Sequence, residues 1–205
     1  YNHRVQKLDA NGKWLKNFTG ITYPYSVAVD SSGNVYAGNN YIRKWDSSGT
    51  FITQWRNFGS QGLSAYNGSV YATDSAYKKI YKYSDTGSLQ ASWSTSNNAQ
   101  PYDVEVNSNG VYVGTGSYHT VQKYSHSGVY SMQWGGCGTG AGKFMYVYGL
   151  DSDGAGNIYV AHFGRGGIQY FDSIGNYIDS IGGSSGTRLA EAKKVIKKLV
   201  SSSDL

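Results

Sequence analysis

A phrase of about 40 residues recurs five times along this chain, and each copy is centred on a turn glycine. These glycines are spaced 37, 38, 41 and 47 residues apart, at Gly12, Gly49, Gly87, Gly128 and Gly175. Seven residues before each glycine stands Val or Ile, and six residues after it stands an aromatic residue in four of the five copies. Units of this kind cannot bury their apolar faces alone, so the spacing predicts a fold of stacked repeats.

Within each copy, alternating apolar and polar residues predict four short antiparallel strands. In the second copy the expected strands are Ser26–Val29, Asn34–Gly38, Tyr41–Trp45 and Phe51–Trp55. The 28 glycines, 20 tyrosines and only 2 prolines are also typical of many short strands. Four-stranded units repeated radially are the blades of a β-propeller. We therefore predict an all-β propeller fold over residues 1–183, with about eighteen strands and equivalent outer-strand sites for Trp55, Trp93 and Trp134.

Several segments carry a family resemblance. Residues 24–37 read PYSVAVDSSGNVYA, residues 42–49 read IRKWDSSG, and residues 2–9 read NHRVQKLD ahead of Gly12. Residues 153–160, DGAGNIYV, repeat the first-hairpin pattern, and the third copy departs from it at residues 62–66. These segments resemble the NHL-repeat family of β-propellers. The resemblance implies four-stranded antiparallel blades, about four and a half in this chain, whereas a typical NHL ring has about six.

Residues 184–205 differ from the repeats. A Ser/Gly linker leads into residues 187–199, where apolar residues fall at helical spacing and lysines occupy much of the remaining surface. We predict a basic amphipathic α-helix here. Because a half blade leaves a strand edge unpaired, we expect an oligomer or a larger assembly with this helix at a contact.

The charge pattern argues against strong nucleic-acid binding. The formal net charge is +5, of which residues 186–205 supply +3, so the repeats have no strongly basic surface. One lysine per blade is expected on the third strand of the first four copies, at Lys7, Lys44, Lys82 and Lys123. This ladder would suit an RNA-binding propeller, as some NHL propellers are, but we favour a solvated surface that resists edge pairing.

The loops that join strands two and three, and those that join successive blades, are expected to share one face of the fold. Polar and aromatic residues in these loops are the candidate binding residues: Asn39, Asn40, Asp74, Tyr77, Tyr118, His119, His162 and Arg165. Side chains of these types make adaptable contacts with proteins and peptides.

Three histidines in the same loops suggest an alternative. A catalytic zinc site needs about three such ligands around one point, and His3, His119 and His162 are the candidates. Propellers that resemble NHL repeats include a zinc lyase acting on peptidyl hydroxyglycines. Nothing besides ring position brings these histidines together, so we expect no metal and no cofactor.

The sequence therefore favours a non-catalytic module that presents loops to a protein, a peptide or further copies of itself. A metal-dependent lyase or hydrolase of the propeller-funnel type is the first alternative, and a single-stranded RNA binder is the second. The Tyr/Ser/Asn/Gly-rich, charge-poor composition favours an extracellular or cell-surface protein, and no apolar run in the sequence is long enough to span a membrane.

Overall fold

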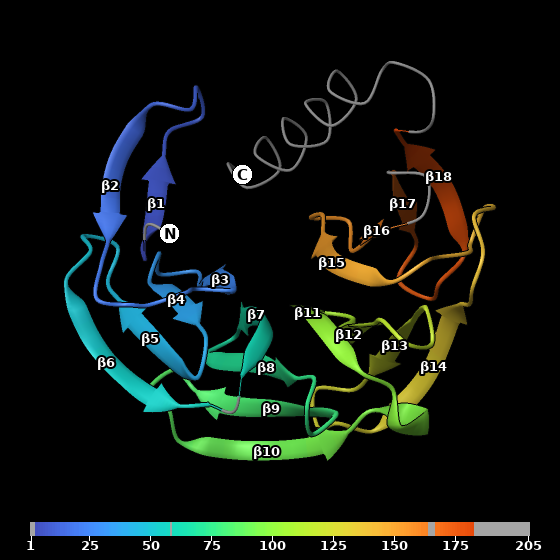
Figure 1. Cartoon of the computed structure of the whole chain (residues 1–205), viewed down its shortest axis with the longest axis horizontal. Coiled ribbons are helices and arrows are strands. Elements are labelled where there is room, and N and C mark those ends of the chain that lie inside the picture. The colour runs from blue at the N-terminus through green and yellow to red at the C-terminus, as the bar shows by residue number, and fades with distance from the viewer. Residues whose placement is uncertain (1–2, 58, 164–166, 183–205) are drawn as a thin grey trace. The chain divides into compact units, whose positions relative to one another are not determined.

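The computed structural model describes residues 3–57, 59–163 and 167–182 (Figure 1). Eighteen β-strands and one short 3-10 helix, Ser96–Asn98, lie in these ranges. No helix among these residues has the length and apolar character needed to cross a membrane. The helix predicted at residues 187–199 and the candidate Arg165 lie outside the described residues. The chain divides into two compact units, residues 1–95 and 96–205.

The first unit contains three antiparallel sheets, each with its strands in chain order. The first sheet has only two strands, β1 (Val5–Leu8) and β2 (Trp14–Phe18). The second sheet comprises β3 (Ser26–Val29), β4 (Val35–Gly38), β5 (Tyr41–Trp45) and β6 (Phe51–Arg56). The third comprises β7 (Ser60–Tyr66), β8 (Ser69–Asp74), β9 (Lys79–Ser84) and β10 (Leu89–Ser94).

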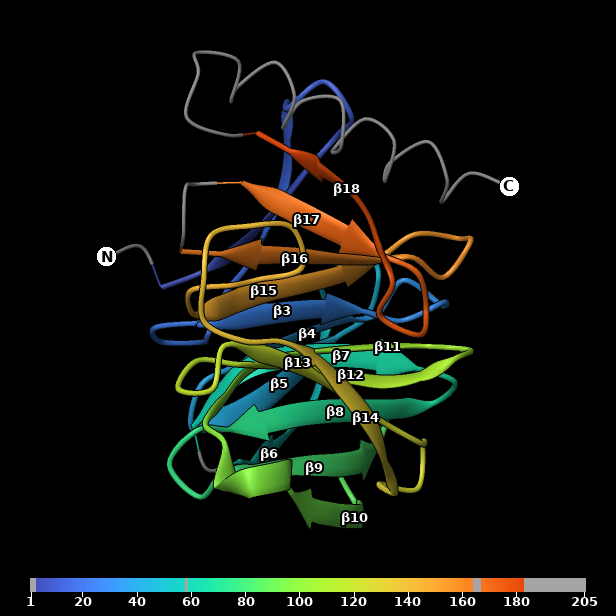
Figure 2. The ribbon, with the colours of Figure 1, turned by 90° about the vertical axis from the view of Figure 1, so that its right-hand side faces the viewer.

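The second unit contains two four-stranded antiparallel sheets, again in chain order (Figure 2). One comprises β11 (Pro101–Asn107), β12 (Gly110–Thr115), β13 (Thr120–Tyr124) and β14 (Tyr130–Gly135). The other comprises β15 (Val147–Ser152), β16 (Ile158–His162), β17 (Ile168–Phe171) and β18 (Tyr177–Ile181). The predicted four-stranded units and the half unit at the start of the repeats are therefore confirmed.

Strand register explains why the repeated phrase is spaced as it is. On the last two strands of each sheet, the Val or Ile before the turn pairs directly with the residue six positions after the glycine. The pairs are Val5 with Phe18, Ile42 with Trp55, Ile80 with Trp93, Val121 with Trp134, and Ile168 with Ile181. The predicted equivalence of the three tryptophans is confirmed.

In two of the repeats, the turn glycine also makes room for a tryptophan of the preceding sheet. Gly87, in the β9–β10 turn, has φ of +93°, and a Cβ added there would lie 2.6 Å from the ring of Trp55 on β6. Gly175, in the β17–β18 turn, has φ of +83° and stands 2.7 Å from Trp134 on β14 by the same measure. Only glycine tolerates both the positive φ and the ring lying on the turn. In both cases the tryptophan of one sheet packs onto the turn of the next sheet in the same unit.

Three hairpin turns show how the local sequence suits the backbone conformation. Asn67 and Gly68 have φ of 46° and 71°, as a type I′ turn requires. In the β3–β4 turn, Asp30 accepts hydrogen bonds from the amides of Ser32 and Asn34 and from the Tyr36 hydroxyl. Burial acts to raise the pKa of Asp30, but these bonds and that from the Asn34 side chain lower it overall. Asp153 occupies the same place in the β15–β16 turn, bonded to Asn157 and Tyr159.

The expected solvated surface is wrong for Lys44, whereas Lys82 and Lys123 are half-buried. Lys44 is only 5 % exposed, and its Nζ atom lies 3.0 Å from Oδ2 of Asp85 in the next sheet's turn. Its ammonium group also lies over the ring of Tyr36, its partner across the ladder, at 5.3 Å. Lys82 and Lys123 lie over Tyr71 and Tyr112 at 5.5 and 5.3 Å in the same way. Sequence alternation placed these lysines on the strand but could not show the tyrosine rings that lie against them or the turn that contacts Lys44.

Candidate functional site

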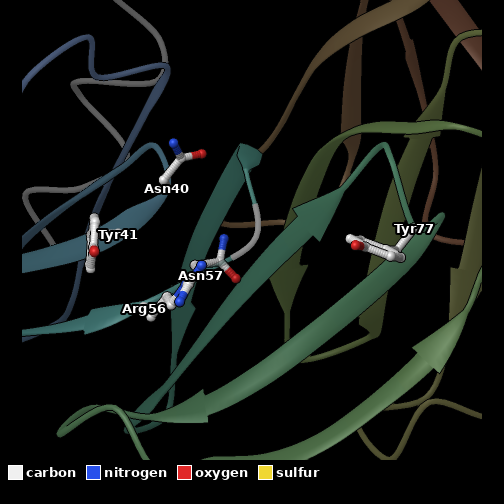
Figure 3. Close-up of a pocket in the computed structure, with 5 residues that line it drawn as sticks. All are labelled: Asn40, Tyr41, Arg56, Asn57 and Tyr77. Carbon is white, nitrogen blue, oxygen red and sulfur yellow. The ribbon is translucent and has the colours of Figure 1, made fainter.

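A pocket of about 330 Å³ lies in the first unit, where three loops meet (Figure 3). Its lining residues are Asn40, Tyr41, Arg56, Asn57 and Tyr77. Asn40 lies in the β4–β5 loop and Tyr41 begins β5. Arg56 ends β6 and Asn57 follows it, and Tyr77 lies in the β8–β9 loop. We call this site the loop pocket. Its position follows the expectation that strand-two-to-three loops and inter-blade loops share a face.

Asn57 is the buried member of the loop pocket, with 1 % of its surface exposed. Its backbone amide donates to the carbonyl of Asn40 at 2.9 Å, which fixes the β6–β7 connection against the β4–β5 loop. Its Oδ1 atom accepts from the hydroxyl of Tyr83 at 3.0 Å. Its Nδ2 atom is buried and has no hydrogen-bond partner among the described residues. Other buried polar side-chain atoms of the described residues share this property, but Asn57 is the one of these residues that lines the loop pocket.

Two tyrosines form the exposed walls of the loop pocket. Tyr41 is 47 % exposed and Tyr77 is 66 % exposed. Large aromatic side chains left in water beside a concave polar surface are typical of a contact site. The loop pocket therefore combines aromatic area, a guanidinium group from Arg56 and a buried amide donor.

Two sequence candidates order the loops instead of lining the pocket. Asp74 is fully buried, and its Oδ1 atom accepts the amide hydrogens of Ala76 and Tyr77, which shapes the β8–β9 loop. Asn39 accepts from the amide of Tyr41 through Oδ1 and donates through Nδ2 to the carbonyl of Thr22. Of the predicted binding residues, Asn40 and Tyr77 line the loop pocket, and their role in binding remains a prediction.

In the second unit, two candidate histidines lie at one loop. Nδ1 of His119 accepts from the amide of Tyr146 at 2.9 Å, and Nδ1 of His162 lies 3.5 Å from the amide nitrogen of Met145. His3 in the first unit repeats the first contact, with its Nδ1 atom 3.3 Å from the amide nitrogen of Tyr23. In all three histidines, Nδ1 thus faces a backbone amide of a loop. This nitrogen is one of the two ring nitrogens that could otherwise bind a metal. Tyr118 is 49 % exposed in the β12–β13 loop.

A glutamine holds the loop around His162. Oε1 of Gln169 accepts from the amide of Gly142 at 2.8 Å, and its Nε2 atom donates to the carbonyl of Lys143 at 2.8 Å. Its Nε2 atom also lies 3.2 Å from Nε2 of His162. Gln122 occupies the same position on the third strand of its sheet. Its Oε1 atom accepts from the amide of Ser96, and its Nε2 atom donates to the carbonyl of Ser96. Strand three therefore fixes the connection that precedes its own sheet.

The surroundings of His162 predict a pH dependence. Burial lowers the pKa of this ring, and both ring nitrogens face N–H groups, which a charged imidazolium would oppose. Below about pH 6.5 the unfolded chain then binds more protons than the folded chain. The contribution of this ring to the free energy of unfolding is therefore fully present above that pH and is lost as the pH drops. In urea denaturation at pH 7.5 and pH 5, we expect the native protein to lose more stability on acidification than His162→Gln. Equal losses would contradict this assignment.

Sequence reasoning missed two groups of residues. Tyr41, Arg56 and Asn57 lie in loops expected at the binding face, but no individual signal marks them, because their importance depends on which loops meet. The other group is acidic: Asp103 on β11 lies near Glu105 and Asp151, and burial raises its pKa to about 7 although the amides of Leu150 and Val104 donate to it. No group of three or more His, Cys, Asp or Glu side chains in the described ranges is arranged to hold a metal ion.

Comparison with solved structures places the sheets in a known fold. The chain superposes on a streptogramin B lyase with a TM-score of 0.70 at 18% identity, covering 89% of this chain and 63% of that one. The fold is that of a β-propeller. U3-55K gives 0.70 at 11% identity over 90% and 62% of the two chains, and virginiamycin B lyase from Staphylococcus aureus gives 0.66 at 12% over 88% and 63%.

These likenesses concern the fold alone, because the identities are low. The chain spans less than two thirds of the length of each of these three structures. No family model matches the sequence, and no curated protein matches it. The NHL pattern accordingly stays a resemblance in the residues, within a confirmed propeller fold.

Proposed function

We propose that this chain is a non-catalytic binding module that recognises a protein or peptide through the loop pocket. The observation that carries the proposal is the meeting of Tyr41, Tyr77, Arg56 and Asn57 in one concave site of the first unit. Tyrosine and arginine are the residue types that most often supply binding energy at protein interfaces. The ordered β4–β5 and β8–β9 loops keep these side chains in place, which lowers the entropy lost on binding. Further copies of this chain remain among the proposed partners, and an extracellular or cell-surface setting is part of the proposal.

Replacing either exposed tyrosine should weaken recognition. We expect Tyr77→Ala and Tyr41→Ala each to reduce affinity by about tenfold or more for a peptide selected on the native protein from a displayed library. Leu89→Ala is the matched control, since Leu89 is 60 % exposed in the same unit but does not line the loop pocket. Affinity measured by fluorescence anisotropy should be unchanged in the control. Unchanged affinity in both tyrosine variants would place binding elsewhere.

A lyase activity is the second candidate, because two of the similar solved structures are lyases. It would rely on His119 and His162, which meet at Met145 and Tyr146 in the second unit. Stoichiometric metal in the purified protein, lost together in His119→Ala and His162→Ala, would favour this candidate over the binding module. An RNA-binding role is less well supported, because Lys44 and Lys123 are engaged by Asp85 and by the carbonyl of Ser173.

A further inference from the structure

The buried amide of Asn57 gives the loop pocket a chemical preference. The side chain is 1 % exposed, its Oδ1 atom is held by Tyr83, and its Nδ2 atom lacks a partner in the described ranges. Figure 3 shows the carboxamide directed into the space between Asn40 and Tyr77. A donor kept out of water without a partner costs free energy that a ligand oxygen would recover. The missing partner is therefore a hydrogen-bond acceptor.

The charge of the pocket selects among acceptors. Arg56, adjacent to Asn57 in sequence, is the charged residue of the lining, and none of the five lining residues is acidic. Asp74 does not line the pocket and is fully buried in the nearby loop; its Oδ1 atom accepts two amide hydrogens, and its Oδ2 atom has no hydrogen-bond partner among the described residues. A guanidinium group and an amide donor together match a carboxylate better than a neutral carbonyl, since bonds to an ionised acceptor are shorter and stronger.

The size and walls of the pocket define what lies next to that carboxylate. About 330 Å³ is near the lower end of small-ligand sites and suits one amino-acid residue. Tyr41 and Tyr77 offer ring surface for an apolar or aromatic side chain beside the charged group. We propose that the loop pocket binds the C-terminal residue of a peptide, with its carboxylate at Asn57 and Arg56 and its side chain between the two tyrosines. This inference rests on the proposed binding function and specifies the chemical class of the ligand.

Two small probes test the inference directly. N-acetyl-phenylalanine carries the carboxylate and the ring, and N-acetyl-phenylalanine amide replaces only the charge. In an NMR titration of the native protein, we expect the carboxylate probe to bind about tenfold or more tightly than the amide. A third probe, the α-amide of N-acetyl-glutamate, presents a side-chain carboxylate without the ring and should bind more weakly than the first. Equal or tighter binding of this third probe would overturn the assignment to a peptide C-terminus.

Three variants locate the effect. Asn57→Asp keeps an oxygen for Tyr83 but turns the donor into an anion, so it should abolish the preference for the carboxylate probe. Arg56→Gln should lower that preference by about fivefold to tenfold. If Asn57→Asp does not fold, Arg56→Gln alone tests whether the carboxylate is bound at this site. Lys13→Gln removes the same charge from an exposed turn in the same unit and should leave binding unchanged.

The outcomes separate this inference from the broader proposal. If library-selected peptides still bind through Tyr41 and Tyr77 while the carboxylate and amide probes bind equally, the carboxylate assignment is wrong and the binding module stands. If the carboxylate preference is present but persists undiminished in Arg56→Gln and Asn57→Asp, the assignment to these two residues is wrong. If neither the probes nor any selected peptide binds, both proposals fail.

Discussion

Gly87→Ala should lower the free energy of unfolding by about 3 kcal/mol, although it adds one methyl group to a surface turn. Two costs combine at this position. The backbone has φ of +93°, which an L side chain rarely adopts, and the new Cβ would lie 2.6 Å from the Trp55 ring. Relief of that overlap requires Trp55 to leave its contacts with Tyr36 and Tyr83. Urea denaturation followed by tryptophan fluorescence measures the change.

Gly12→Ala is the matched control for this prediction. Gly12 occupies the same turn position with φ of +81°, but nothing lies within 4 Å of an added Cβ. It should therefore cost only the backbone term, about 1 kcal/mol. Gly175→Ala, which meets Trp134 at 2.7 Å, should behave like Gly87→Ala. Similar losses at all three glycines would show that backbone conformation alone requires glycine and that packing of the tryptophan on the next turn contributes nothing.

Gln169→Leu should cost a comparable amount, about 3 kcal/mol. The leucine has nearly the same shape but leaves the amide of Gly142 and the carbonyl of Lys143 without their partners. It also removes the side chain facing Nε2 of His162. Amide hydrogen exchange should therefore accelerate in residues 140–146 more than in the strands of the second unit.

Gln6→Leu tests whether the side chain or the position matters. Gln6 stands at the same place in the two-stranded sheet, where its side chain is exposed and its Nε2 atom donates to Oδ1 of Asn17. Its replacement should change stability by about 0.5 kcal/mol or less. A loss as large as that of Gln169→Leu would contradict the view that strand three fixes the loops through buried glutamine.

Local patterns predicted the strands and turns because local chemistry decides them. Alternation placed Ile42 and Trp45 on a strand. Asn67 and Gly68 favour the type I′ turn between β7 and β8 by their own chemistry, without reference to the rest of the chain. Contacts between repeats could not be predicted from local sequence patterns in this way. Lys44 meets Asp85 across 41 residues, and the prediction of a solvated lysine failed because sequence alternation does not reveal which turn covers a strand.

The candidate site was predictable at the level of loops and less so at the level of residues. Asn40 and Tyr77 were marked because polar and aromatic residues stood in the expected connections. Asn57 looks unremarkable in sequence, and its unpartnered amide becomes visible only when Tyr83 and Asn40 are brought to it from other strands. The same limit holds for the histidines, because their sequence positions do not show that the Nδ1 atoms of His3 and His119 accept backbone hydrogen bonds.

The central claim is that the first unit binds its partner through the loop pocket. The most direct measurement is an amide NMR map of the labelled protein saturated with a library-selected peptide. The account predicts the largest shifts in residues 39–41, 56–57 and 74–78, with the loss of those shifts in Tyr77→Ala. Shifts concentrated in the second unit around His119 and Tyr146, with the first-unit loops unchanged, would contradict it.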